Sequence, residues 1–230
     1  NGFDLKNLLD NTTLHIVPLV NPDGMEIAVK GEDGLQTREI VEAFKTMSGT
    51  AQQWKANANG VDLNRNFTCE NWGKVLPGRP KSDLINHSPH SQYYKGPEPA
   101  SEKETQAIEK LMEENSYKIL FDIHSKGRVI YYYKAIQTQE FNDKTYEIAQ
   151  KVSEVSGYQV LPKTMSTYGE GTDGNTTDFS AEKGIHSLTI ETMLFHIPYP
   201  YPIDLIKEEW NYIQDIGSVL AQETLNLAQE

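Results

Sequence analysis

Two ionisable side chains stand at the ends of short apolar runs, where a folded sheet would hold them rigidly. His124 follows the run KILFDI and precedes a glycine-containing loop, a position that suits a metal ligand or a general base. Glu191 ends the run LTIE, and burial there would raise its pKa toward the range that a general base needs. Two plainer interpretations stay open: a half-buried structural histidine, and a carboxylate held in a salt bridge.

A third candidate is an arginine inside an apolar frame. Asn64 and Arg65 lie at the polar centre of the segment Val61–Phe67, VDLNRNF. A guanidinium held rigidly among asparagine side chains presents a planar fork that fits a carboxylate. Alternatively, Arg65 pairs with an internal acid, for which Asp62 is the nearest candidate.

The motifs of several other enzyme classes are missing from the sequence. It contains no HExxH, no CxxC, no phosphate-binding GxxxxGK[ST] and no GxSxG nucleophile elbow. Cys69 is the single cysteine, so an internal disulfide is impossible. A serine or cysteine hydrolase is therefore poorly supported.

Short apolar runs alternate with amphipathic stretches, and these elements must position the candidates. The predicted strands are Leu14–Val20, Lys118–His124, Val129–Tyr133 and Ser187–Leu194, and the NPDG that follows the first is a predicted turn. Helices are predicted from Ser101, with a capping box between Ser101 and Glu104, and over Lys144–Val155, Thr177–Glu182 and Leu205–Leu227. The alternation predicts one α/β domain, in which ligands bind beyond the carboxyl ends of the strands.

Composition narrows the range of partners. The 230-residue chain has 21 Lys and Arg against 33 Asp and Glu, a formal net charge of −12. Such a field repels phosphate groups, so we expect neither nucleic acid nor anionic lipid as a partner. No run approaches the ~18 to 20 apolar residues that span a bilayer, and no secretory signal is recognisable. The single cysteine fits a reducing compartment, but secreted bacterial enzymes often lack disulfides as well. Cytoplasm, cell envelope and secretion all stay open as locations, and so does the oligomeric state.

Six motifs in a fixed order resemble the zinc carboxypeptidase family. They are VPLVNPDG (Val17–Gly24), GVDLNRNF (Gly60–Phe67), YKGPEPASEKET (Tyr94–Thr105), DIHS (Asp122–Ser125), TDF (Thr177–Phe179) and TIET (Thr189–Thr192). Each motif alone is weak, but GVDLNRNF followed by IHS and IE in this order is specific. The resemblance implies a mixed, mostly parallel central sheet flanked by helices, and a zinc-dependent peptidase activity on a peptide substrate.

The resemblance also implies roles for the matched positions in hydrolysis. His124 resembles the third zinc ligand of the family, and Glu191 resembles its general base. Lys55 follows Trp54 at the place where pancreatic members carry an arginine that stabilises the oxyanion. A lysine there keeps the positive charge but not the two-pronged geometry.

Substrate-binding roles follow in the same way. Asn64 and Arg65 resemble the pair that grips the free carboxylate of the substrate. Tyr168 resembles the mobile tyrosine that closes over the substrate, although its spacing to Asp178 is longer than usual. Thr177 falls near the position that sets side-chain preference. We expect His124, Arg65 and Glu191 to converge on one cleft.

One part of the family pattern is absent from this chain. The family takes its first two zinc ligands from an HxxE motif upstream of the NPDG, and none of the six histidines here is followed by Glu or Asp three places on. Because open catalytic zinc sites normally need three protein ligands, we expect no properly coordinated zinc in this chain alone. We expect an N-terminally shortened piece of a longer enzyme; an inactive relative is the alternative.

The sequences of two motifs favour a bacterial cell-wall peptide as substrate. WKANANGVDLNRNF and YKGPEPASEKET look more like bacterial members, several of which cut the γ-D-glutamyl–diamino acid bond of cell-wall peptides. Thr177 is small and uncharged, and so neither demands a basic side chain nor blocks a polar zwitterion. We therefore expect a cell-wall peptide as substrate; the alternatives are a general C-terminal carboxypeptidase and a carboxylate-binding module without a metal.

Overall fold

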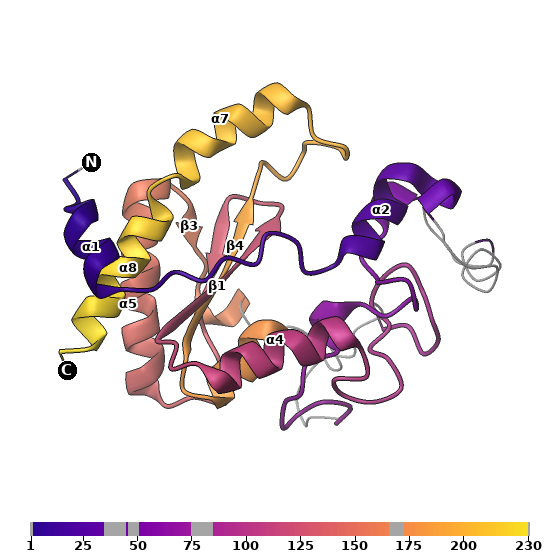
Figure 1. Cartoon of the computed structure of the whole chain (residues 1–230), viewed down its shortest axis with the longest axis horizontal. Coiled ribbons are helices and arrows are strands. Elements are labelled where there is room, and N and C mark those ends of the chain that lie inside the picture. The colour runs from indigo at the N-terminus through magenta and orange to yellow at the C-terminus, as the bar shows by residue number, and fades with distance from the viewer. Residues whose placement is uncertain (1, 35–44, 46–50, 75–84, 166–172, 230) are drawn as a thin grey trace. The chain divides into compact units, whose positions relative to one another are not determined.

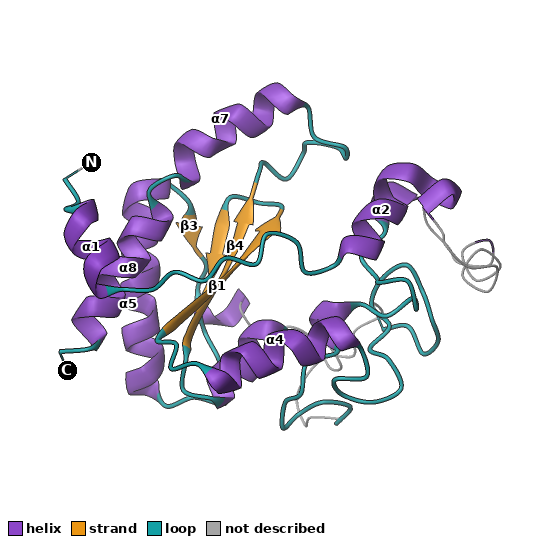
Figure 2. Ribbon diagram, in the orientation of Figure 1, coloured by secondary structure: helices purple, strands orange, loops and turns teal. Residues whose placement is uncertain are grey.

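The computed structural model describes residues 2–34, 45, 51–74, 85–165 and 173–229. The chain divides into two compact units. We call residues 1–16, 117–167 and 180–230 the sheet unit, and residues 17–116 and 168–179 the loop unit. Figure 1 labels many of the helices and strands of both units. Figure 2 shows the strands together among the helices of the sheet unit, whereas loops make up much of the loop unit.

The sheet unit is built on four strands in the order β1-β4-β2-β3. Their bounds are β1 Ile119–Ser125, β2 Val129–Tyr131, β3 Gln159–Val160 and β4 His186–Thr192. β1 runs parallel to β4 and β2 runs parallel to β3, whereas β2 and β4 are antiparallel. The prediction of a mixed, mostly parallel sheet is confirmed, and three of the four predicted strands correspond to β1, β2 and β4.

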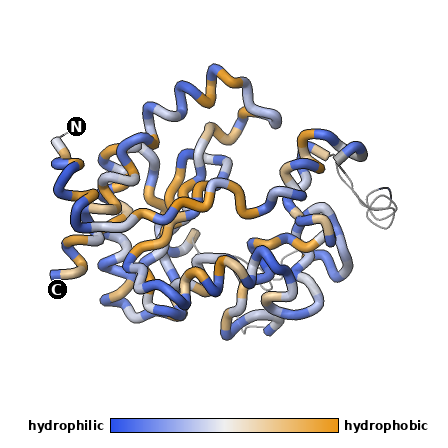
Figure 3. Tube along the Cα trace, in the orientation of Figure 1, coloured by the Kyte–Doolittle hydropathy of each residue, from blue (hydrophilic) through white to orange (hydrophobic). Residues whose placement is uncertain are grey.

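Among the described residues, the helices that lie wholly in the sheet unit are α1 Leu5–Asn11, α5 Gln139–Ser156, α7 Ile203–Ile213 and α8 Ile216–Leu227. Apolar side chains of α5 and α8 pack on the strands, and Figure 3 shows the apolar residues gathered along the strands. The buried core consists of Ile130, Ile148, Ala149, Val152, Tyr158, Leu188, Ile190, Ile216, Val219 and Leu220. This core fixes β4 and β2 from one side and so fixes the position of Glu191.

The predicted closing helix over Leu205–Leu227 is two helices in the structure. α7 ends at Ile213 and α8 begins at Ile216. The break falls just before Gly217, the weakest helix former in the predicted stretch. The predicted helix over Lys144–Val155 is confirmed within α5, which starts at the cap Thr138 and stops at Gly157 in the left-handed conformation.

The loop unit contains α2 Pro22–Lys30 and α4 Lys103–Glu114, and α6 Thr176–Glu182 begins in it and ends in the sheet unit. Between these helices the chain is irregular. Buried asparagine side chains there form hydrogen bonds with main-chain groups that have no partner in a helix or strand. Asn66 is fully buried; its Nδ2 donates to the carbonyls of Lys95 (2.8 Å) and Glu98 (3.0 Å), and its Oδ1 accepts from the Glu102 amide (3.1 Å). Such bonds satisfy buried main-chain groups and explain the polar centre of VDLNRNF.

Two local predictions at the start of the chain are wrong. Leu14–Val20 forms no strand, and its apolar side chains Leu14, Ile16, Val17, Leu19 and Val20 are exposed. No described strand pairs with this run, so its apolar pattern has no sheet to pack on. The NPDG is not a turn but the start of α2, because the Asn21 side chain accepts from the Gly24 amide (2.9 Å) and Pro22 occupies the first helical position.

The predicted capping box of α4 is also wrong, although the helix is present. α4 begins at Lys103 after Glu102, without a side-chain cap. The Ser101 hydroxyl instead donates to Glu102 (2.7 Å) and accepts from Asn66 (3.0 Å), while Glu104 accepts from Asn57 (3.3 Å). Both residues of the predicted capping box therefore form hydrogen bonds with distant asparagines, Ser101 with Asn66 and Glu104 with Asn57, and not with the main chain at the start of the helix. Within the described residues, no helix combines the length and the hydrophobicity that crossing a bilayer requires.

Candidate active site

His124 and Glu191 lie on neighbouring strands at the same edge of the sheet. They are Cα partners in the parallel pair of β1 and β4, and each is the penultimate residue of its strand. Because side chains alternate along a strand and partners in register share a face, His124 and Glu191 project from the same face. Asp122 shares that face, with its Oδ2 4.0 Å from Nε2 of His124. The structure therefore brings the two sequence candidates of this unit together and adds a second carboxylate beside the histidine.

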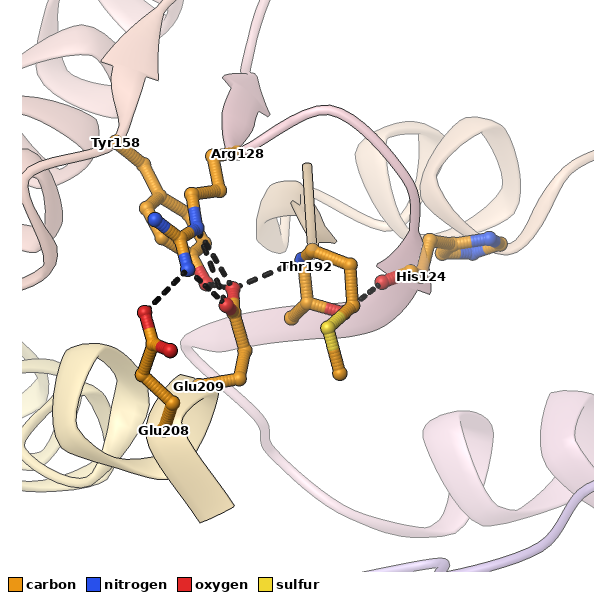
Figure 4. Close-up of polar contacts among 7 residues, drawn as sticks. His124, Arg128, Tyr158, Thr192, Glu208 and Glu209 are labelled. Atoms are coloured by element: carbon orange, nitrogen blue, oxygen red, sulfur yellow. Dashed lines mark hydrogen bonds and ion pairs between the residues drawn. The ribbon is translucent and has the colours of Figure 1, made fainter. Parts of the chain in front are cut away.

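Hydrogen bonds connect the carboxyl ends of β1 and β4 and the residues that follow them. The Thr192 hydroxyl donates to the His124 carbonyl (2.7 Å), as Figure 4 shows. The Gly127 amide lies within hydrogen-bond distance of the carbonyls of both Thr192 (3.1 Å) and Met193 (2.9 Å). These bonds fix the separation of the two strand ends, and so the spacing between His124 and Glu191.

A buried ionic cluster extends this support to α7. Glu209 is only 3% exposed and accepts from Nη2 (2.6 Å) and Nε (3.1 Å) of Arg128, from the Tyr158 hydroxyl, and from the Met193 amide (2.8 Å). Figure 4 shows Arg128 and Tyr158 meeting Glu209 from different segments. Burial by itself would raise the pKa of Glu209, but the hydrogen bonds from Arg128, Tyr158 and Met193 together lower it below the usual glutamate value.

Tyr201 is a further group near Glu191 that the sequence did not single out. Burial is the main cause that raises the pKa of Tyr201 to about 12, and the neighbouring charge of Glu191 adds to the rise. The phenol therefore stays protonated at neutral pH. The YPYP segment gave no signal for it, because only the fold brings this loop to the end of β4.

In the loop unit, Asn64 and Arg65 lie in the short 3₁₀ turn Leu63–Arg65. The Asn64 side-chain oxygen accepts from the amide (3.1 Å) and the hydroxyl (3.0 Å) of Thr176, which fixes its orientation. Arg65 donates from Nη1 to the Asn64 carbonyl (2.5 Å). These contacts join the turn to the start of α6.

The alternative that Arg65 pairs with Asp62 is wrong. Asp62 is buried, and its Oδ2 accepts from the Tyr93 amide (3.0 Å). Among the residues that the structure describes, Arg65 forms no ion pair with any carboxylate. A half-buried guanidinium without an internal acid is suited to bind an external carboxylate.

Lys55 and Arg65 share one aromatic ring. The Tyr93 ring lies 5.1 Å from Nζ of Lys55 and 5.8 Å from Cζ of Arg65, both within the range of cation–π attraction. The structure therefore brings together the two cations that the sequence assigned to the oxyanion and to the substrate carboxylate. Tyr93 was not predicted, since nothing local marks a tyrosine between a proline-rich loop and YKGPEP as a platform for cations.

The remaining candidates have different outcomes. Tyr168 lies outside the described residues. Thr177 is buried, and its hydroxyl donates to the Asn175 side chain (2.7 Å), so its role in side-chain preference stays a prediction. Within the described ranges, no group of three His, Cys, Asp or Glu side chains is arranged to hold a metal ion.

Comparisons with known proteins give the relationship of the chain. The sequence model of the family described as zinc carboxypeptidase matches residues 3–212. Gamma-D-glutamyl-L-diamino acid endopeptidase 1 of Lysinibacillus sphaericus is 30% identical over 172 residues, which cover 73% of this chain and 40% of that protein. Carboxypeptidase B of Rattus norvegicus is 30% identical over 203 residues, which cover 81% of this chain and 42% of that protein.

A solved structure agrees at the level of the fold. Bovine thrombin-activatable fibrinolysis inhibitor, solved in complex with tick carboxypeptidase inhibitor, superposes with a TM-score of 0.72 at 20% identity, covering 97% of this chain and 73% of that chain. The chain spans 40% and 42% of the lengths of the two curated relatives above.

Proposed function

Since the chain belongs to the zinc carboxypeptidase family, we propose that it carries the proton-transfer and carboxylate-binding parts of a metallopeptidase. The reaction is hydrolysis of a peptide or amide bond next to a free carboxylate. The observation that carries the proposal is the in-register placement of His124 and Glu191 at the ends of β1 and β4. A histidine and a carboxylate fixed at one sheet edge fit a ligand and a base that act on the same water.

Each residue has a part in this reaction. Arg65 binds the substrate carboxylate, and Asn64 holds the turn that presents it. Glu191 accepts a proton from the attacking water and passes it to the leaving amine. Lys55, held over Tyr93, stabilises the negative charge that develops on the scissile carbonyl oxygen.

The requirement for zinc is inferred from membership of the family. The described residues supply His124 but no group of three ligands, so they do not fit a complete zinc site. We propose that the active enzyme takes its two further ligands from residues outside this chain.

The proposed substrate is a γ-D-glutamyl–diamino acid bond in bacterial cell-wall peptides. A relative named for that activity is 30% identical over 73% of the chain, which supports the proposal. A general C-terminal metallocarboxypeptidase is the second candidate, since carboxypeptidase B is equally identical over more of the chain. A carboxylate-binding relative without metal is the third.

The complete gene product, loaded with zinc, separates these candidates. It is incubated with a γ-D-glutamyl–diaminopimelate peptide and with ordinary peptides that have free C-termini. Release of C-terminal amino acids from the ordinary peptides rejects the cell-wall substrate in favour of the second candidate. Metal analysis of the same protein tests the third candidate, the carboxylate-binding relative without metal. Zinc bound in stoichiometric amount would rule that candidate out.

The role of Glu191 has its own test in the same protein. Glu191→Gln is expected to lower kcat by at least about a hundredfold while zinc stays bound, because a base, unlike a ligand, is not needed to hold the metal. Glu154→Gln, an exposed change on α5, is the matched control and leaves kcat unchanged. If kcat survives Glu191→Gln, the proposed mechanism is wrong.

A further inference from the structure

Lys95 is a buried cation with an unusual environment. The residue is 9% exposed, and its ammonium has no hydrogen-bond partner among the described residues. Its Nζ lies 4.7 Å from the centre of the Trp72 ring, a cation–π contact. Burying a charge without a hydrogen-bonded partner is costly, so this position calls for an explanation beyond packing.

Trp72 connects this lysine to the carboxylate-binding arginine. The Trp72 indole N–H donates to the Arg65 carbonyl (3.0 Å), and the Phe67 amide donates to the Gly174 carbonyl (2.9 Å). Gly174 lies so close to the same Arg65 carbonyl that a Cβ built on it would be 2.4 Å from the oxygen. Trp72 and Gly174 therefore lie against the Arg65 carbonyl, and Lys95 lies against the Trp72 ring.

Two carboxylates adjoin Gly174. Asp173 is buried directly before Gly174, and Asp178 accepts from the Gly174 amide (3.1 Å). Burial lowers the pKa of Lys95, while Asp173, Cys69 and Asp178 oppose the fall and Arg65 adds to it. Lys95 thus shares a low-dielectric neighbourhood with two acids and with Arg65.

We propose that Lys95 is a positioning residue for Arg65: its ammonium supplies the counter-charge of Asp173 and Asp178 and so leaves the Arg65 guanidinium to bind a ligand carboxylate. This inference rests on the proposed role of Arg65. It accounts for a buried cation whose charge interacts with two acids, and for the absence of an ion pair on Arg65 within the described part of the chain. Without Lys95, both acids would attract the guanidinium inward and compete with the ligand.

The experiment uses this chain and two matched probes. Acetyl-Ala-Ala has a free carboxylate and acetyl-Ala-Ala-amide has none, and each is titrated while the Arg65 Nε–H signal is followed by NMR. The chain is expected to bind the acid and not the amide, and Arg65→Gln is expected to abolish binding of the acid. If acid and amide bind equally, or if Arg65→Gln binds like the original chain, the proposed carboxylate site itself is wrong, and the Lys95 inference is rejected with it.

Variants at Lys95 then test the inference separately. Lys95→Met is expected to raise the Kd for the acid roughly tenfold, the effect of one charge removed several ångströms from Arg65. Adding Asp173→Asn to Lys95→Met is expected to restore the Kd to within about twofold, because it removes a competing carboxylate. Lys95→Arg keeps the charge and is expected to keep binding, and Lys103→Met, the same change on the exposed face of α4, is the control.

Several results overturn the inference while leaving the Arg65 site intact. Unchanged binding by Lys95→Met does so, as does a loss that Asp173→Asn fails to reverse, since a purely structural lysine would behave that way. If Lys95→Met does not fold, the double variant decides alone because it buries no net charge. Binding at the original strength by the double variant supports the inference, and weakened binding by a folded double variant rejects it.

Discussion

Gly174 approaches Arg65, the proposed carboxylate-binding residue, closely through its main chain. Its φ is +94°, and a Cβ built there would lie 2.4 Å from the Arg65 carbonyl oxygen and 2.8 Å from Cδ1 of Trp72. The first of these atoms is main chain and cannot move aside without displacing Arg65. We expect Gly174→Ala to lower the free energy of unfolding by about 3 kcal/mol, measured by urea denaturation, because it combines backbone strain with a clash.

Gly184 is the matched control for this prediction. Its φ is +74°, but a Cβ there would have no atom within 4 Å. Gly184→Ala should therefore lose only the left-handed backbone term, about 1 kcal/mol. Equal losses in the two variants would show that the close approach to Arg65 contributes nothing.

A candidate site residue could be predicted only where the neighbouring sequence marks it. His124, Glu191 and Arg65 stand at strand ends or within a framed motif, so type and position sufficed to single them out. Tyr93 and Lys95 contact residues far from them in the sequence: Arg65 lies over the Tyr93 ring, and Lys95 lies over the Trp72 ring. Neither has a pattern of its own, and only the folded chain reveals them.

At the scale of elements, Glu209 joins α7 to the ends of the strands. Its carboxylate binds Arg128 just before β2, Tyr158 just before β3 and the Met193 amide just after β4. Glu209→Gln removes the charge and deprives the half-buried Arg128 of its strongest partner, leaving the exposed Glu208 at 3.9 Å. We expect a loss of about 3 kcal/mol in the free energy of unfolding at pH 7, measured by urea denaturation.

The pH dependence of that loss follows from the lowered pKa of Glu209. Since the folded pKa lies below the unfolded value of about 4.3, the ionised carboxylate stabilises the fold fully above that value. This stabilisation disappears as the pH falls through the folded pKa, so the two proteins should converge in acid. Glu208→Gln is the control: Glu208 is 56% exposed and 3.9 Å from Arg128, and should contribute under about 1 kcal/mol at any pH.

The predicted elements succeeded where periodicity and tertiary partners agreed. β1, β4 and α5 were found because their apolar pattern is long and the core uses it. Leu14–Val20 has an equally apolar pattern, but no described strand pairs with it, and pattern alone cannot supply a partner. β3 is only two residues long, which is too short for a periodic pattern of apolar residues. The capping box was wrong because Ser101 and Glu104 form hydrogen bonds with Asn66 and Asn57 instead.

At the scale of the whole molecule, the order of six motifs predicted the family and the mixed sheet without any contact being known. The order of motifs does not show which strand forms the edge of the sheet. In the described sheet, β1 is at one end of the order β1-β4-β2-β3, so no described strand pairs with its outer side. Ile123 on this strand is 51% exposed, an apolar side chain on an unpaired edge.

An unpaired, apolar edge strand is a template for pairing with another chain. We therefore expect this chain by itself to self-associate with increasing concentration, measured by sedimentation velocity. Ile123→Lys should shift the distribution toward monomer, because edge lysines oppose strand pairing. Val29→Lys is the control, since Val29 is 73% exposed but lies on α2. A chain that stays monomeric throughout, or two variants that reduce association equally, would mean that the β1 edge is not the contact.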